Sequence, residues 1–435
     1  MLTVLAFVVT IVIIVAFHEW GHFLAMRAFG VRVLTFSVGF GPKILRFTDK
    51  KGTQWVISAI PLGGYVKPLD CRDDETAADT PGEFSGKPAW QRVITYAAGP
   101  VFNFILALLI YWSLMFGYGQ NDLLAISGPV TPASAAAQAG FEPGDRIIAA
   151  GDAEIQGWSP FISQLILHLG EKPPLDVTVV TPSGARAERA LDLSAWAADA
   201  EKDPLAALGL HQAVVIGEVM DDSPAQQAGF RRGDQVVSLN GEPVDGWGPW
   251  QQAIMDNPRT AMQAGVLRDG ETLTLTFTPK SVAHDGKQYG QLGVALGGLY
   301  QREFGPVQAV SAALGRFGEQ TTVVWASLVK LVTGKLSLDN LGGPITIAQV
   351  AGESASVGLA SFLALLAYLS ITLGVINLLP VPMLDGGWIF FGIIEMIRGR
   401  SLSERFLLAA QGIGMTLVIS FMLLAIYNDL VRQFS

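Results

Sequence analysis

Residues 17–22 read FHEWGH and lie inside the first long apolar run of the chain. On a helix, His18 and His22 lie on the same face, because residues four apart are neighbours there. Two imidazoles so placed can bind one zinc ion, and Glu19 beside them can take a proton from water. The motif therefore predicts a hydrolytic zinc site, with His18 and His22 as metal ligands and Glu19 as the catalytic base.

The alternative is that these are ordinary polar residues near a helix end. The chain has only five histidines in 435 residues. Burying two of them and a glutamate in an apolar segment is costly unless they have partners. The metal-site interpretation therefore outweighs the alternative.

Composition places this chemistry in a membrane. Half of the residues are hydrophobic (50%) and only 15% are charged, which is too apolar for ordinary soluble domains. A single cysteine, Cys71, excludes an internal disulfide framework and cannot by itself make a thiolate zinc site. Membrane lipid is an expected partner, and nucleic acid is not.

Four apolar runs are long enough to cross a hydrocarbon core of about 20 residues. The predicted transmembrane helices are residues 1–28, 93–116, 360–385 and 406–428. Residues 27–92 carry ten Lys or Arg, whereas residues 117–360 carry fifteen together with twenty-six Asp or Glu. Since positive charge gathers in short cytoplasmic loops, the loop 29–92 is expected inside, and both termini and the long acidic segment outside.

The first loop contains β-branched and aromatic residues around glycine turns, including Gly39, Phe40 and Gly41. This pattern predicts β-hairpins instead of a helix. An apolar hairpin beside a buried protease site could enter the membrane and pair with an extended substrate. A loop that merely packs on the helices fits the same residues equally well.

The long outer segment contains an internal repeat. Residues 134–145 recur as residues 223–234, a period of 89. Each copy predicts a short helix, a Gly-Asp turn, an apolar strand and another helix. The two units, residues 123–205 and 206–300, resemble PDZ domains, which bind peptide termini at a sheet edge. The alternative role of the two units, steric filtering of substrates, stays open. Residues 301–359, which follow them, are expected to form amphipathic or connecting helices.

A third metal ligand must come from outside the first helix, because hydrolytic zinc usually takes three protein ligands. Asp385 is the best candidate, since it follows the third apolar run and is expected at the same depth as the histidines. Glu395 is the fallback, but it stands close to Arg398 and Arg400 and is expected to be a solvated charge.

Asn377 precedes Pro380 and Pro382, which interrupt helical hydrogen bonding where free backbone groups must line a cavity or meet a partner. Its amide could bind the substrate backbone or a tetrahedral oxyanion, or it could serve only in helix packing. In the second run, Gly99 and Asn103 share one helical face, and packing against the helix of the zinc motif is the minimum expectation.

Taken together, these motifs resemble the site-2 protease family, and within it the bacterial regulator of sigma-E protease type. The resemblance covers essentially the whole chain. It rests on the following features: His18-Glu19-x-x-His22, Gly99-x-x-x-Asn103, Asn377-x-x-Pro380-x-Pro382-x-Leu384-Asp385-Gly386, the loop segments 36–41 and 61–67, and the two PDZ-like units.

The resemblance implies a fold and a function. The fold is a polytopic α-helical membrane protein with four transmembrane helices, membrane-associated β-hairpin elements and two tandem α+β PDZ-like domains. The implied protein is a Zn²⁺-dependent intramembrane endopeptidase of the bacterial inner membrane, with periplasmic termini and PDZ domains and an active site towards the cytoplasm. It also assigns Gly39, Phe40 and Gly41 to substrate handling and Asn377 to contact with the substrate or transition state.

The implied substrate is a single-pass membrane protein, such as an anti-sigma factor after a first periplasmic cut, and remnant signal peptides are further candidates. A rival of another class is a catalytically inactive PDZ-bearing membrane scaffold or receptor, which would bind substrates without turnover. A metal transporter would need polar residues along several spans, which the second and fourth runs lack.

Overall fold

The computed structural model describes residues 2–72, 76, 80–169, 174–197, 203–284, 287–336, 338 and 342–434. The chain divides into two compact units. The first unit comprises Met1–Tyr118, Phe304–Trp325 and Leu341–Ser435, and the second comprises Gly119–Glu303 and Ala326–Asn340.

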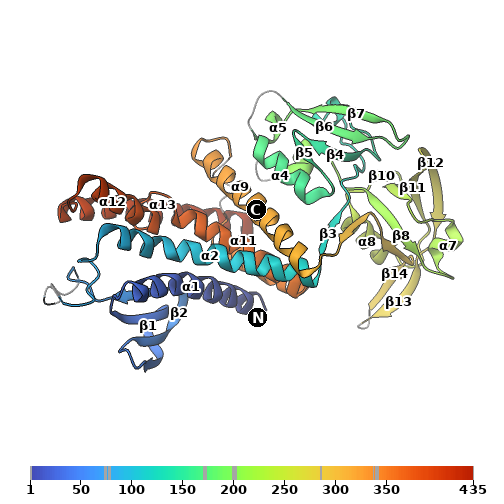
Figure 1. The fold of residues 1–435 in the computed structure, drawn as a ribbon. Helices are drawn as coiled ribbons and strands as arrows, with labels where there is room; N and C mark the ends of the chain where they lie inside the picture. Colours follow the sequence, from blue (N-terminus) through green and yellow to red (C-terminus); the bar gives the residue numbers. More distant parts are fainter. Residues whose placement is uncertain are drawn as a thin grey trace. The chain divides into compact units, whose positions relative to one another are not determined.

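Within the described residues, four helices of the first unit are long and apolar enough to cross a membrane, which confirms the predicted number of spans. They are α1 (Leu2–Ala28), α2 (Ala89–Gly117), α11 (Leu359–Asn377) and α13 (Glu404–Phe434). Helix α2 packs against α1 and α11, and these three run side by side in Figure 1. The remaining helices are α9 (Pro306–Val332), whose residues are divided between the two units, α10 (Pro344–Val357) and α12 (Asp385–Arg398).

The third span is shorter than predicted, because α11 ends at Asn377 and not at Asp385. Pro380 and Pro382 have no backbone N–H to continue the helix, and Met383 adopts a positive φ of 93°. Asp385 therefore does not end a transmembrane helix. It begins a separate one, α12, which packs against α2.

Glu395 on α12 is not the solvated charge that the sequence predicted. Its side chain is only 8% exposed and forms an ion pair with Arg92 of α2. Its other oxygen accepts a hydrogen bond from the backbone N–H of Leu402 at 2.9 Å. Charge spacing along the chain did not reveal this partner, which is 303 residues away.

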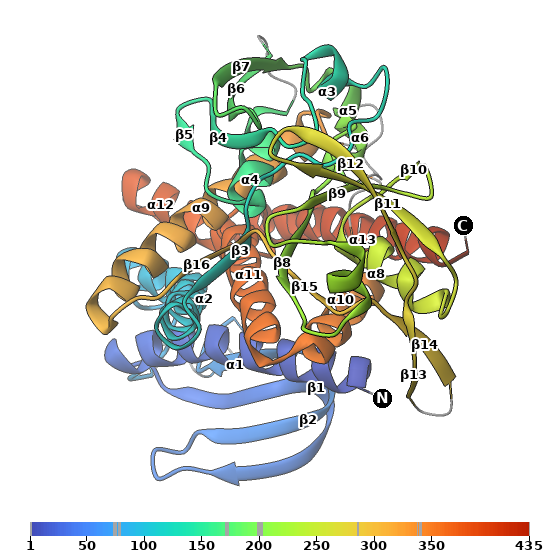
Figure 2. The same cartoon turned by 90° about the vertical axis from the view of Figure 1, so that its right-hand side faces the viewer.

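The first loop forms two long strands, β1 (Val33–Thr48) and β2 (Gln54–Pro68), which lie beside α1 in Figure 2 and contact it. Each strand bends, so that Phe36 pairs with Val66 on one side and with Trp55 on the other. The outer part of β1 leaves large apolar side chains more than 60% exposed, namely Ile44, Leu45 and Phe47. The predicted β-hairpins are therefore observed, with an apolar outer surface.

Helix α10 packs against α1 and is tied to the last span by Asp429. The buried Asp429 carboxylate accepts hydrogen bonds from the backbone N–H groups of Gly343, Ile345 and Thr346 and from the Thr346 hydroxyl. It therefore satisfies the free amides at the start of α10, as a capping side chain does.

The second unit contains two similar modules. The first has a four-stranded sheet in the order β5-β4-β6-β7, and the second a larger sheet containing the path β12-β11-β9-β8-β15. The elements of the first module are β3 (Gln120–Leu123), α3 (Ala135–Gln138), β4 (Arg146–Ala150), β5 (Ala153–Glu154), α4 (Trp158–His168), β6 (Leu175–Val180), β7 (Arg186–Leu191), α5 (Ser194–Ala197) and α6 (Pro204–Leu208). Those of the second are β8 (Val214–Val219), α7 (Pro224–Ala228), β9 (Gln235–Leu239), β10 (Glu242–Pro243), α8 (Trp247–Asp256), β11 (Met262–Arg268), β12 (Glu271–Phe277), β13 (Lys280–His284), β14 (Lys287–Gln291), β15 (Val294–Leu296) and β16 (Leu299–Arg302).

The repeat explains why the modules are similar. Ser134 and Ser223 occupy equivalent positions, and each caps the helix that follows it. The aspartate of each Gly-Asp turn is buried in an ion pair, Asp145 with Arg189 and Asp234 with Arg268. The predicted order of helix, turn, strand and helix is observed in both copies.

Candidate active site

Two histidines of α1 and one carboxylate of α12 meet in the first unit. The Nε2 atoms of His18 and His22 lie 3.2 Å apart, and both side chains are buried. Asp385 Oδ2 lies 3.1 Å from His18 Nε2 and 3.5 Å from His22 Nε2. The structure thus brings together the three residues that the sequence predicted as metal ligands.

The backbone of α2 fixes how His22 presents its ring. His22 Nδ1 lies 2.8 Å from the carbonyl oxygen of Thr95. Because a carbonyl can only accept, Nδ1 carries a hydrogen, and in the neutral ring Nε2 then presents a lone pair towards Asp385. A hydrogen bond of this kind to the second ring nitrogen is the usual way in which proteins orient a metal-binding histidine.

Asn103 plays the corresponding part at His18. Its amide Nδ2 lies 3.3 Å from His18 Nδ1, while its Oδ1 is buried and has no hydrogen-bond partner among the described residues. A half-turn of the amide would let Oδ1 accept from Nδ1–H, which would free His18 Nε2 as a lone-pair donor. Asn103 therefore contacts the motif, beyond the helix packing that was the minimum expectation.

Close helix packing brings these groups together. A Cβ added to Gly21 would lie 2.2 Å from the carbonyl oxygen of Ala98, so only glycine allows α1 and α2 to approach this closely. A Cβ added to Gly99 would lie 2.3 Å from His22 Nε2. The small residues of this interface create the space that the imidazoles occupy.

Glycines also bring Asp385 into place. Asp385 is the first residue of α12, where a carboxylate is favoured by the helix dipole. The preceding loop folds over this first turn, so that a Cβ on Gly386 would lie 2.2 Å from the Leu379 carbonyl oxygen. Gly414 of α13 supports the same loop, since a Cβ there would lie 1.8 Å from the Pro382 carbonyl oxygen.

Glu19, the predicted base, lies between the histidines in sequence and faces strand β2. A Cβ on Gly64 would lie 3.2 Å from Glu19 Cγ and 2.9 Å from Val15 Cγ1. The backbone of Val66 interacts with the Glu19 carboxylate. The bent sheet of the first loop therefore packs directly on the helix face that carries the base.

The three ligand atoms fit a metal ion. The two imidazole nitrogens and the carboxylate oxygen all lie within 4.8 Å of one another. In the His22 tautomer set by Thr95, a lone pair on Nε2 faces the negative Asp385 oxygen, which is repulsive unless a cation or proton lies between them. Two histidines and one carboxylate form a donor set that hydrolytic zinc sites use, with the fourth position open.

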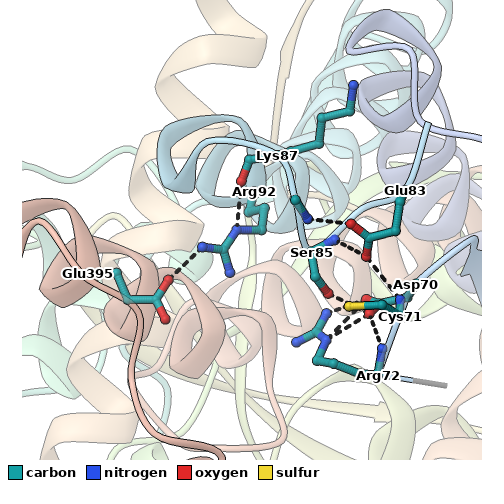
Figure 3. Close-up of polar contacts among 9 residues, drawn as sticks. Asp70, Cys71, Arg72, Glu83, Ser85, Lys87, Arg92 and Glu395 are labelled. Carbon is teal, nitrogen blue, oxygen red and sulfur yellow. Dashed lines mark hydrogen bonds and ion pairs between the residues drawn. The ribbon is translucent and has the colours of Figure 1, made fainter. Parts of the chain in front are cut away.

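A second group of potential ligands is already occupied by hydrogen bonds. Asp70, Cys71 and Glu83 lie within ligand distance of one another, and Figure 3 shows their contacts. Glu83 accepts from the backbone N–H groups of Cys71, Ser85 and Gly86. Burial raises the pKa of Glu83, but these three donors outweigh burial and hold it below its usual range. The arrangement stabilises a loop and does not need a metal.

The residues predicted to handle substrate lie on two other segments. Gly39 has φ +92°, and a Cβ there would lie 2.9 Å from the Ser58 carbonyl oxygen, so the bend in β1 requires glycine. Gly41 also has a positive φ, of 84°, and Phe40 between the two glycines is 44% exposed. Asn377 is half-buried and is the last residue of α11.

Thr95 and Gly64 are among the contributors that sequence reasoning missed. Thr95 acts through its backbone carbonyl, which any residue type could supply, so its side chain carries no signal. Gly64 belongs to the Gly63-Gly64 pair in the predicted hairpin, and this pair indicated a turn instead of a close approach to Glu19.

Comparison with known proteins agrees with this site. Residues 6–421 match the model of peptidase family M50. The regulator of sigma-E protease of Salmonella typhimurium is 38% identical over 98% of both chains, and that of Escherichia coli is 36% identical over the same shares. A relative from Neisseria meningitidis is 37% identical over 99% of both chains, and its name contains the words zinc metalloprotease. The chain therefore belongs to peptidase family M50, the site-2 protease family, and is a zinc-dependent metalloprotease.

Proposed function

We propose that this chain is an intramembrane endopeptidase that cuts the transmembrane segments of single-pass proteins. The observation that carries the proposal is the meeting of His18, His22 and Asp385, three potential ligands within 4.8 Å of one another next to apolar spans. In this proposal the three side chains hold the zinc ion, and Glu19 is the base. Bound zinc supplies Lewis-acid chemistry at the scissile amide.

The protein's own groups carry the proton and orient the substrate. Glu19 takes a proton from the attacking water and delivers it to the leaving nitrogen. Thr95 and Asn103 hold the two imidazoles in fixed orientations through their second ring nitrogens. Asn377 donates an amide N–H to the oxyanion or to the substrate backbone.

The bent sheet supplies a route for unwinding the substrate. A helical peptide hides its carbonyls in its own hydrogen bonds, so part of it must become extended before attack. We propose that Gly39, Phe40 and Gly41 belong to the surface on which the substrate is held as an added strand. The support is that β2 of the same sheet packs on Glu19 and that the apolar outer surface of β1 suits a membrane.

The proposed physiological role is based on the names of the relatives. Two of them are named regulators of sigma-E, so we infer that this chain also acts in regulated intramembrane proteolysis. The proposed substrate is an anti-sigma factor already cut in the periplasm, with remnant signal peptides as further substrates. The proposed location is the bacterial inner membrane, with both termini and the second unit in the periplasm and the active site towards the cytoplasm.

The two modules of the second unit are proposed to be PDZ-like domains. In the second module, a pocket of about 470 Å³ is lined by residues of helix α8 and strand β14 and by the start of β15. Trp247, Trp250, Ile254 and Leu292 are among its lining residues, and an apolar groove between a strand and a helix suits the end of a peptide. Steric exclusion of large substrates by the pair of modules is the alternative role.

The test is cleavage of a single-span model substrate by the purified chain in detergent, with zinc content measured on each sample. We expect wild type to cut, Glu19→Gln to keep zinc without cutting, and His18→Ala to lose both. Equal activity of wild type and Glu19→Gln would remove Glu19 as the base. Binding of helix-destabilised substrates without cleavage by the zinc-loaded wild type would favour the scaffold alternative.

A further inference from the structure

Helix α12, which begins with Asp385, is held against α2 at a place away from the histidines. Arg92 Nη2 lies 2.6 Å from Glu395 Oε2, and the two side chains are 18% and 8% exposed. Both charged groups have further partners, since Arg92 Nε donates to the carbonyl of Lys87 and Glu395 accepts from the N–H of Leu402. Figure 3 shows the Arg92 side chain reaching across to Glu395. The pair is therefore a fixed, well-satisfied contact between two helices.

A second contact holds the first turn of α12. The Trp388 ring stacks on Tyr96 of α2, with centroids 5.6 Å apart and planes 13° apart. The Arg72 guanidinium lies 5.5 Å from the centroid of the same indole. Arg72 is itself fixed by an ion pair with Asp70, which also accepts the Ser85 hydroxyl. Trp388 thus contacts both an aromatic ring and a cation, which are favourable partners for indole.

These contacts act on the segments that place the proposed ligands. Tyr96 directly follows Thr95, whose carbonyl orients His22. Trp388 lies three residues after Asp385, on the first turn of the same helix. The part of α2 that fixes the ring of His22 is therefore the part that contacts the helix of Asp385.

Without these contacts, the position of Asp385 would depend on an irregular connection and on the packing of its loop against Gly386 and Gly414. The segment between α11 and α12 contains two prolines and Met383 with φ 93°, and it offers few helical hydrogen bonds to fix a direction. Metal sites require ligand positions within about 0.2 Å. A short helix carrying a ligand therefore needs a support of its own.

We propose that Arg92 and Glu395, together with the stack of Arg72, Trp388 and Tyr96, are positioning residues that hold α12 where Asp385 reaches His18 and His22. The inference rests on the proposed metal site. It gives a role to the Arg92–Glu395 ion pair, which takes no part in the reaction chemistry itself.

The test measures zinc affinity directly, by competition with a chelator, on the purified full chain in detergent. Arg92→Gln is expected to weaken zinc binding about 10- to 100-fold, as loss of a supporting contact does in other metal sites. Arg92→Lys keeps the charge and is expected to retain most of the affinity. At saturating zinc, kcat of Arg92→Gln should fall while KM stays within about twofold, because the substrate surface is untouched.

Arg398→Gln is the matched control, since it removes an exposed charge from the same helix, and it should bind zinc as wild type does. If Arg92→Gln does not fold, the pair Trp388→Ala and Trp388→Phe decides the question, because only the alanine variant removes the stack. Wild-type zinc affinity in the folded Arg92→Gln variant or in Trp388→Ala would overturn the proposal, whether or not kcat falls. His18→Ala separates the two proposals: if it keeps zinc, the metal site itself is wrong.

Discussion

Replacing Gly99 by alanine should disable the site with the addition of one carbon atom. Gly99 lies on α2 opposite the zinc motif of α1. An added Cβ would lie 2.3 Å from His22 Nε2, 2.6 Å from His22 Cε1 and 2.8 Å from His18 Cε1. The new methyl group would overlap with both imidazoles. Both rings are buried in close-packed surroundings, so neither can easily move away.

The size of the effect follows from these distances. Ordinary contact begins at 3.4 Å, so His22 or the helix must move by about 1.1 Å (3.4 − 2.3). That is several times the tolerance of about 0.2 Å for metal ligands. A misplacement of about 1 Å commonly costs about 100-fold in rate, which corresponds to about 2.7 kcal/mol. The extra methyl group should also lower the free energy of unfolding by about 1–3 kcal/mol.

The assay compares kcat/KM for a single-span substrate and the zinc dissociation constant of Gly99→Ala with those of wild type. Gly117→Ala is the control, because Gly117 lies at the end of the same helix and an added Cβ there would meet no atom within 4 Å. We expect loss of zinc affinity and of activity in Gly99→Ala only. A Gly99→Ala protein with wild-type zinc affinity and kcat/KM would refute the claim that this glycine makes room for the ligands.

Three further changes probe other parts of the chain. Gly64→Val should slow cleavage at least about tenfold while zinc is retained, because the new side chain would crowd Glu19. An unchanged kcat would show that β2 does not constrain the position of the base. Arg268→Leu leaves the buried Asp234 carboxylate unpaired and should destabilise the second module by about 3 kcal/mol, visible as faster hydrogen exchange in β9 and β11. Asp429→Asn should weaken the cap of α10 by about 1 kcal/mol, and unchanged exchange at the first amides of α10 would contradict this.

Much of the fold is readable from the sequence because its signals are local. A span needs about 20 apolar residues, and this requirement alone locates all four helices. The 89-residue repeat predicts the strand Arg146–Ala150, and its counterpart Gln235–Leu239 is observed at the equivalent place. The spacing of His18 and His22 likewise predicts a shared helix face, since a helix fixes that relation within four residues.

Of the missed features, the end of the third span is a local effect, and the partner of Glu395 depends on tertiary packing. The third span was predicted to run to Asp385 because hydropathy continues through Pro380 and Pro382, although these prolines end the helix at Asn377. Glu395 was expected in water because its neighbours in sequence are charged, whereas its partner Arg92 comes from a distant helix. No pattern along one segment reports which distant segment will lie against it.

Residues that are unfavourable in an ordinary helix or in an apolar interior lie together at the first turn of α12. Their position there supports the placement of the active site. Gly386 and Gly387 occupy the first turn of α12, although glycine costs about 1 kcal/mol in a helix relative to alanine. The partly buried carboxylate of Asp385 faces two imidazoles where an apolar contact would be more stable. Sequences tolerate such local costs mainly at functional sites. The contacts between α12 and α2 stabilise the position of α12, and so compensate for the unfavourable glycines and the Asp385 carboxylate at its first turn.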